Sequence, residues 1–130
     1  MHLHISAADG VPIYQQIVQQ IKTLVAAGRL AAGEELPPIR VLAEQLVVNP
    51  NTVARAYREL AAAGVLTNRR TAGTYVADGA EPRAQQQCLD GLSERVDELL
   101  AEARRLKVGV QELLDLIRRR DDTTRKRKEK

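Results

Sequence analysis

The segment from Asn49 to Gly64 constrains the fold of this chain more than any other. Asn49 is a suitable helix cap, and Pro50 fits the first helical position, where its missing N–H costs nothing. One face then carries apolar residues at spacings of three and four, namely Val53, Ala56, Tyr57 and Leu60. The opposite side and its flanks carry Asn51, Thr52, Arg55 and Arg58. The pattern predicts a short amphipathic helix with a polar, basic exposed face that ends at Gly64.

Two more amphipathic helices are expected before this one. Apolar residues recur at helical spacing from Tyr14 onward, and Gly28 ends that pattern. The pair Pro37-Pro38 marks the start of the next helix, which buries a second apolar face. Three short helices with aliphatic faces suit a chain that has only three aromatic residues in 130.

A hairpin is expected after the third helix. Residues 66–68 and 74–76 resemble short strands, and the stretch 69–73 between them is basic and contains a glycine. Helices followed by a basic hairpin predict a mainly α fold with a small β wing. We assign residues 1–78 to this winged helix-turn-helix domain, with its core at 11–77.

Residues 79–122 are expected to form a separate helical region, because a long apolar stripe at helical spacing follows the small polar linker from Asp78 to Pro82. The break at 107–109 divides it into two helices. A stripe with no other apolar surface in its own segment needs a partner, and a second copy of the chain is the commonest one. The predicted dimer interface comprises Leu89, Leu92, Val96, Leu99, Leu100, Ala103, Leu113 and Ile117. The basic tail, 123–130, is predicted to be disordered.

The charge distribution points to nucleic acid more clearly than the net charge of +3 does. Between Arg40 and Arg70 there are five arginines and only two acidic residues, Glu44 and Glu59. A helix fits the major groove of B-DNA, where Asn can pair with adenine and Arg with guanine or phosphate. A helix N-terminus also favours a phosphate.

Several function classes lack support in the sequence. Cys88 is the only cysteine, so we expect no internal disulfide and no thiolate metal site. No nucleophile is paired with a base and no glycine-rich phosphate loop is present, so we expect neither an enzyme nor a cofactor. Apolar runs fall far short of the roughly 20 residues of a membrane span, and the first residues lack a basic segment followed by a long apolar run, so we expect neither a membrane span nor a signal peptide. We expect a cytoplasmic protein.

The sequence from about Val11 to Ala77 resembles the GntR family at many independent points. The matching residues are Gly28-x-Leu30, Gly33, Leu36-Pro37-x-x-Arg40, Leu42-Ala43, Asn49-Pro50-Asn51-Thr52-Val53, Ala56-Tyr57, Leu60, Gly64-x-Leu66, Arg70 and Gly73-Thr74-Tyr75-Val76. The resemblance implies a transcriptional regulator, usually a repressor, that binds an inverted-repeat operator as a homodimer. The short C-terminal part resembles the YtrA-like subfamily, whose tails dimerise. An effector ligand is compatible with the family, and the sequence does not identify one.

The resemblance also implies a set of DNA-binding residues, with the recognition helix in the major groove and the wing at the minor groove or phosphates. The set comprises Arg40, Asn49, Asn51, Thr52, Arg55, Arg58, Arg69, Arg70, Thr71 and Gly73. Some family members place Arg where this chain has Pro50 and Ala54, so its operator should differ from theirs. The wing has Arg70-Thr71-Ala72-Gly73 where many members have Arg-Gly-x-Gly.

Other interpretations remain open at several positions. Asn49 can be a cap and a DNA contact at once, whereas Arg55 and Arg58 are either DNA contacts or solvated charges. Tyr57 fits packing better than contact. His2, His4 and Cys88 fit a surface or packing role better than a metal or redox site. A helical adaptor that binds another protein is the rival function, and a monomer in solution would favour it over a dimeric regulator.

Overall fold

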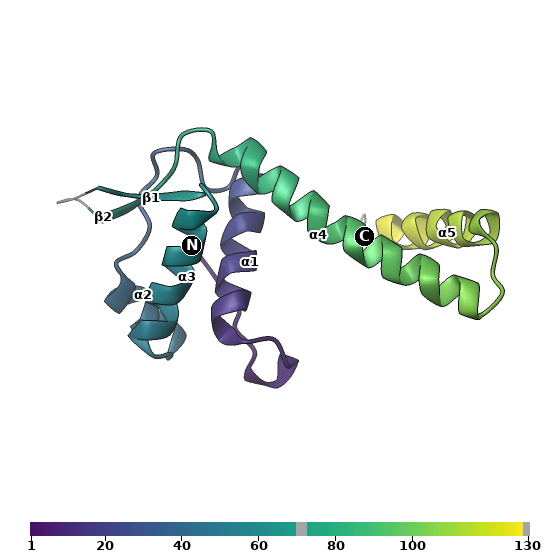
Figure 1. Ribbon diagram of the computed structural model, residues 1–130, viewed down its shortest axis with the longest axis horizontal. Helices are drawn as coiled ribbons and strands as arrows, with labels where there is room; N and C mark the ends of the chain where they lie inside the picture. The colour runs from purple at the N-terminus through teal and green to yellow at the C-terminus, as the bar shows by residue number, and fades with distance from the viewer. Residues whose placement is uncertain (70–72, 129–130) are drawn as a thin grey trace. The chain divides into compact units, whose positions relative to one another are not determined.

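The computed structural model describes residues 1–69 and 73–128, which form two compact units, Met1–Leu89 and Asp90–Lys130 (Figure 1). The described part of the chain is mostly helical with one antiparallel hairpin, as the sequence predicts. The predicted Arg70 and Thr71 contacts lie outside the described residues.

Three helices and the hairpin build the first unit. The helices are α1 (Ile13–Ala26), α2 (Ile39–Leu46) and α3 (Pro50–Ala62), and both α1 and α2 pack against α3. Their facing side chains are almost completely removed from solvent and are nearly all aliphatic. The largest fully buried residues are Ile17, Ile21, Val25, Leu36, Leu42, Val53, Leu60, Val65 and Val76. This core fixes the position of α3, the helix with the predicted DNA-reading face.

The three helices of the first unit end in the same hydrogen-bonded motif. In each, a left-handed residue follows the helix, and the N–H of the next residue donates to a carbonyl five residues earlier. Gly28 and Gly64 occupy the left-handed position after α1 and α3, with φ of 75° and 78°. After α2 the same position holds Val47, with φ of 55°. A β-branched residue is rarely found in this conformation.

The hairpin consists of β1 (Leu66–Arg69) and β2 (Gly73–Val76), with Leu66 opposite Val76. The segment before α2 adds to the outer edge of β2. Leu36 N–H donates to the Thr74 carbonyl at 2.8 Å, and Val76 N–H donates to the Glu34 carbonyl at 2.9 Å. These bonds tie the wing to the loop that leads into α2.

Side-chain amides of α1 hold the N-terminal segment. Gln16, which is 7% exposed, accepts from the Ser6 N–H and donates to the carbonyls of Ser6 and Val11. One turn later, Gln20 makes the equivalent pair of bonds with the backbone of His4. A short 3-10 turn, η1 (Ala7–Asp9), follows. These bonds involve only the backbone of His4, whose side chain is exposed.

The helix α4 (Ala80–Arg105) begins inside the stretch that the sequence predicts as a linker. Pro82 lies in its first turn, where a proline is tolerated. Ala80 and Ala84 are buried in the core of the first unit, which therefore extends to Leu89 rather than to residue 78. Arg83 donates to the Gly64 carbonyl at 3.0 Å, and Gln87 donates to the Ala63 carbonyl at 3.0 Å. These bonds satisfy carbonyls at the C-terminal end of α3.

The second unit contains the rest of α4 and the helix α5 (Val110–Lys128). Lys107, with φ of 60°, forms the predicted break between them. The prediction of a disordered tail from residue 123 is wrong for residues 123–128, which continue α5. An Arg125–Asp121 pair at 3.2 Å supports the extension, and the Thr123 and Thr124 hydroxyls donate to carbonyls one turn earlier. Basic residues in the last turn also suit the helix dipole.

Candidate nucleic-acid interface

The N-terminus of α3 is arranged as the sequence predicts. Asn49 is the N-cap, its side-chain oxygen accepts the Asn51 N–H at 2.8 Å, and Pro50 is the first helical residue. Because Asn49 Oδ1 is used by the cap, the side chain retains its amide N–H groups as donors. Such a side chain suits a phosphate acceptor better than two-bond pairing with adenine, which needs both the oxygen and the nitrogen.

The outward face of α3 carries the predicted polar and basic residues. Asn51, Arg55 and Arg58 are exposed and Thr52 is partly exposed, while the apolar face of the helix is buried. Asn51 lies in the first turn and is exposed to solvent, so its amide can present a donor and an acceptor together. This face has the side-chain chemistry that base edges in a major groove require.

Arg40 lies on the same surface although it belongs to a different helix. It is the second residue of α2, it is exposed, and it lines a shallow hollow together with Val47, Asn49 and Pro50. The α2 N-terminus and the α3 N-terminus therefore contribute side chains to one region of the first unit.

Two of the predicted arginines are stacked on tyrosine rings. The guanidinium carbon of Arg55 lies 3.7 Å from the ring centroid of Tyr14 in α1. That of Arg69 in β1 lies 4.4 Å from the ring centroid of Tyr75 in β2. Both distances are within the range of cation–π attraction. Stacking uses the flat face of a guanidinium and leaves the N–H groups along its edge available to acceptors.

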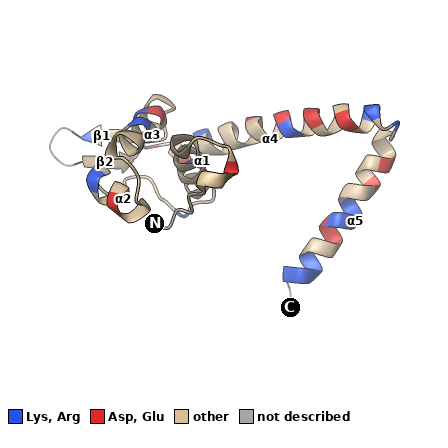
Figure 2. Ribbon diagram, turned by 90° about the horizontal axis from the view of Figure 1, so that it is seen from below, with Lys and Arg blue, Asp and Glu red and all other residues tan. Residues whose placement is uncertain are grey.

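The arginines of the head have no carboxylate partner within the described residues. Ion pairs in that part of the chain join Arg118 to Asp115 and Arg125 to Asp121, both in α5. Figure 2 shows that both basic and acidic residues occur along α4 and α5. In the first unit, Arg40, Arg55 and Arg58 are instead exposed to solvent. A surface of this kind attracts phosphate.

The described part of the wing has one conformational requirement. Gly73 has φ of 99°, and a Cβ at this position would lie 3.3 Å from Glu35 Oε1. Glycine is therefore needed for the entry into β2, which gives Gly73 a structural reason in addition to the contact predicted for it.

The third tyrosine has a packing role, as the sequence favours. Tyr57 is 4% exposed, and its hydroxyl donates to the Pro37 carbonyl at 2.7 Å. Burial raises the pKa of this phenol above its usual range. The bond joins α3 to the loop immediately before α2, which helps to fix the helix that carries Arg40.

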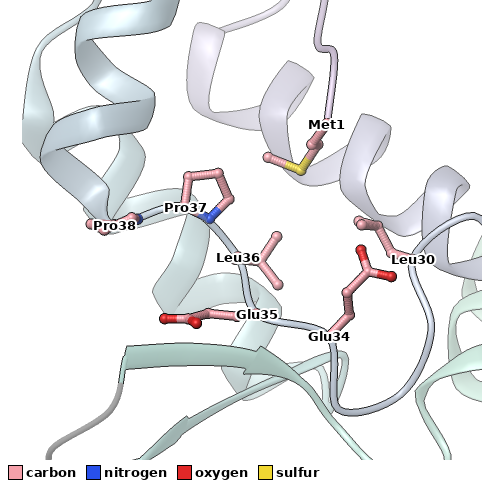
Figure 3. A pocket seen from close by; sticks show the side chains of 7 residues that line it. All are labelled: Met1, Leu30, Glu34, Glu35, Leu36, Pro37 and Pro38. Carbon is pink, nitrogen blue, oxygen red and sulfur yellow. The ribbon is translucent and has the colours of Figure 1, made fainter.

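A pocket of about 420 Å³ lies beside the start of α2, between Met1 and the loop that leads into the helix (Figure 3). Glu34 points toward Leu30 across it, whereas Glu35 points away on the other side of the loop. Its polar side chains are these carboxylates, which repel phosphate. The pocket is not part of the basic surface.

The predicted dimerisation stripe divides into exposed and buried residues. Leu89, Leu92, Val96, Leu99 and Ile117 are between 41% and 55% exposed, which is unusual for large apolar side chains at helical spacing. Leu100 is partly exposed. Ala103 and Leu113, in contrast, are 7% exposed in the single chain and lie close to the turn between α4 and α5. These two already have packing partners within the chain.

Among residues 1–69 and 73–128, no group of three or more His, Cys, Asp or Glu side chains is placed to hold a metal ion. None of the helices in that part of the chain is long and apolar enough to cross a membrane.

The sequence did not identify three features of this surface, namely the rings of Tyr14 and Tyr75 and the conformation of Val47. Each tyrosine contacts an arginine of a different element, and no local pattern marks such a pair. Glycine usually marks the left-handed residue at a helix end, as Gly28 and Gly64 do in this chain. Because α2 is followed by a valine at this position, the sequence did not indicate the same motif there.

Comparisons with known proteins agree with this arrangement. The family model "Bacterial regulatory proteins, gntR family" matches residues 13–76. The chain is 33% identical to the HTH-type transcriptional repressor YtrA of Bacillus subtilis over 89% of each protein. A transcriptional regulator from Oenococcus oeni superposes with a TM-score of 0.75 at 29% identity, covering 90% of this chain and 97% of the other. YtrA from Sulfolobus acidocaldarius, a GntR-family transcription factor, gives 0.56 at 39% identity, over 58% and 79% of the two chains.

Proposed function

Because this chain belongs to the GntR family of bacterial regulatory proteins, we propose that it is a repressor that binds an inverted-repeat operator as a homodimer. Members of the family are transcriptional regulators with a DNA-binding domain, and the first unit has the fold of that domain. The name of the Bacillus subtilis relative, a transcriptional repressor, supports the direction of regulation.

The observation that carries the proposal is the outward face of α3. Its first turn is capped by Asn49, and the residues that follow present amide and guanidinium groups to solvent. Asn51 has both groups needed for adenine, so we assign base reading to Asn51 and phosphate contact to Asn49. Arg40 approaches the same region from α2 and extends the basic surface. The proposed contact set is completed by the α3 residues Thr52, Arg55 and Arg58 and by the wing residues Arg69, Arg70, Thr71 and Gly73.

The exposed stripe of the second unit supports the homodimer. Leu92, Val96 and Leu99 are each at least 41% exposed at spacings of three and four on α4. Burying them against the same residues of a second copy removes this surface from water and gives a two-fold symmetric interface. A two-fold dimer presents two symmetry-related DNA-binding units, which is why an inverted repeat is the expected operator.

Selection of bound duplexes from a random pool tests the proposal with the full chain. The expected product is an inverted repeat with half-sites spaced by about one helical turn or a multiple of it. A matched control uses Asn51→Ala, which leaves the cap at Asn49 and the core of α3 unchanged. This variant should lose preference at one position in each half-site.

Two results would contradict the proposal. A pool without enrichment would mean that the surface of α3 does not read sequence. Enrichment of a single half-site, together with a mass in solution of 14.4 kDa, that of the monomer, would contradict the homodimer.

A further inference from the structure

We infer that Tyr14 is a positioning residue for DNA recognition, because its ring holds the Arg55 guanidinium in place before DNA is bound. The inference rests on the proposed function, since it gives Arg55 a DNA acceptor to bind. Tyr14 belongs to α1, which is not the helix that enters the groove. It acts on DNA only through Arg55.

The geometry of the pair is the first step. The guanidinium carbon of Arg55 lies 3.7 Å from the centroid of the Tyr14 ring, which is the distance of direct stacking. Tyr14 is itself partly buried against the core, so its ring is fixed by packing. Its hydroxyl also accepts a hydrogen bond from the Gln15 side chain at 3.2 Å. A fixed ring therefore underlies a long, otherwise exposed side chain.

Stacking restricts Arg55 without occupying its hydrogen-bond donors. A free arginine loses rotamer freedom when it binds, and this loss opposes binding. Contact with the ring removes part of that freedom in advance. The described residues provide no carboxylate partner for Arg55 that would compete with DNA. The edge of the guanidinium remains free for an acceptor on DNA, either a guanine edge or a phosphate oxygen.

The wing repeats the arrangement with different residues. Arg69 lies over Tyr75 at 4.4 Å, again with the ring on a neighbouring element. Two of the three tyrosines in the chain thus lie under arginines of the basic surface. Arg58, on the same exposed side of α3, is not stacked on a ring in the described part of the chain and serves as the internal comparison.

A double-mutant cycle on the full chain tests the inference, with the duplex obtained by selection as the probe. Tyr14→Leu should weaken binding by about two- to fivefold, because it removes the ring and keeps the apolar bulk. Tyr14→Phe should bind with wild-type affinity, because it keeps the face of the ring on which Arg55 stacks. In an Arg55→Ala background, Tyr14→Leu should have no further effect. In an Arg58→Ala background, Tyr14→Leu should keep its full effect.

The identity of the acceptor is read from modified duplexes. If Arg55 binds guanine, replacing single guanines by 7-deazaguanine weakens wild-type binding and has no effect on the Arg55→Ala variant. If Arg55 binds phosphate, replacing a single phosphate by a neutral methylphosphonate weakens wild-type binding and has no effect on the Arg55→Ala variant. Either pattern supports the inference.

Three outcomes would overturn it. Tyr14→Leu without effect on affinity, equal losses for Tyr14→Phe and Tyr14→Leu, or the same loss with and without Arg55 would each show that the ring does not act through Arg55. If Tyr14 had only a structural role, Tyr14→Leu would cause the same loss with and without Arg55. A lowered midpoint of thermal unfolding in the Tyr14→Leu variant would identify that role. Wild-type binding to the selected duplex reports on the proposed function independently of the cycle.

Discussion

Val47 provides a stability prediction whose magnitude follows from its conformation. It follows α2 with φ of 55°, in the motif that Gly28 and Gly64 complete after α1 and α3. A side chain in this left-handed region costs roughly 1–2 kcal/mol because Cβ approaches the following carbonyl oxygen. Val47 is 89% exposed, so replacing it loses little apolar burial. The chain therefore carries strain here that packing does not offset.

Replacing Val47 should stabilise the first unit. Val47→Gly removes the clash, but glycine loses about 0.5–1 kcal/mol more backbone freedom on folding. The net gain in the free energy of unfolding is then about 0.5–1 kcal/mol. Val47→Asn should gain about 1 kcal/mol, because asparagine tolerates the left-handed region. For a domain of this size, 1 kcal/mol raises the midpoint of thermal unfolding by about 4–8 °C.

Tyrosine circular dichroism follows this transition in the full chain, because Tyr14, Tyr57 and Tyr75 all lie in the first unit. Val47→Ala is the matched control, since alanine keeps a Cβ in the strained position. The reasoning is refuted if the glycine and asparagine variants unfold at or below the wild-type midpoint. It is equally refuted if the alanine variant gains as much as the glycine variant.

Three further predictions address the DNA surface, the second unit and the core. Arg40→Ala should weaken binding to the selected duplex by about 1–3 kcal/mol with an unchanged unfolding midpoint, and unchanged affinity in an isotherm would remove Arg40 from the contact set. Leu99→Asp should give a monomer with full helical content and most of the operator affinity lost, because a dimer would bury the carboxylate; a dimer in sedimentation would place the interface elsewhere. The raised pKa of Tyr57 means that the folded state holds its proton more tightly than the unfolded state, so the free energy of unfolding should fall by about 1.4 kcal/mol per pH unit above about pH 10. Tyr57→Phe should remove that part of the slope in denaturant titrations, and an unchanged slope would assign it to other groups.

Local signals in the sequence were sufficient for most of the first unit. The cap at Asn49, the proline after it and the glycines at 28 and 64 each act within a few residues, so their effect can be predicted without tertiary contacts. The polar exposed face of α3 was predicted directly from the helical spacing of its apolar residues. The resemblance implied a DNA contact for Arg40, but its placement beside Asn49 depends on the packing of two different helices and was not predicted.

The differences lie where tertiary contacts or helix continuation decide the structure. The polar stretch before Pro82 looked like a linker, but Ala80 and Ala84 are buried in the core and make it helical. The residues after 122 are too charged to be buried in a core, which is why disorder was predicted. An ion pair and a hydroxyl-to-carbonyl hydrogen bond, each between residues one helical turn apart, nevertheless support the continuation of α5. The stack of Arg55 on Tyr14 depends on how α1 packs against α3, which no short pattern records.

The affinity of the full chain for the selected inverted repeat, compared with a scrambled duplex of the same length at one salt concentration, tests the central claim most directly. Phosphate contacts contribute to both duplexes, whereas base reading contributes only to the first. We predict that the selected duplex binds at least about 10³-fold more tightly, as two chains per duplex. Equal affinity for the two duplexes would contradict the claim that this protein is a sequence-specific regulator.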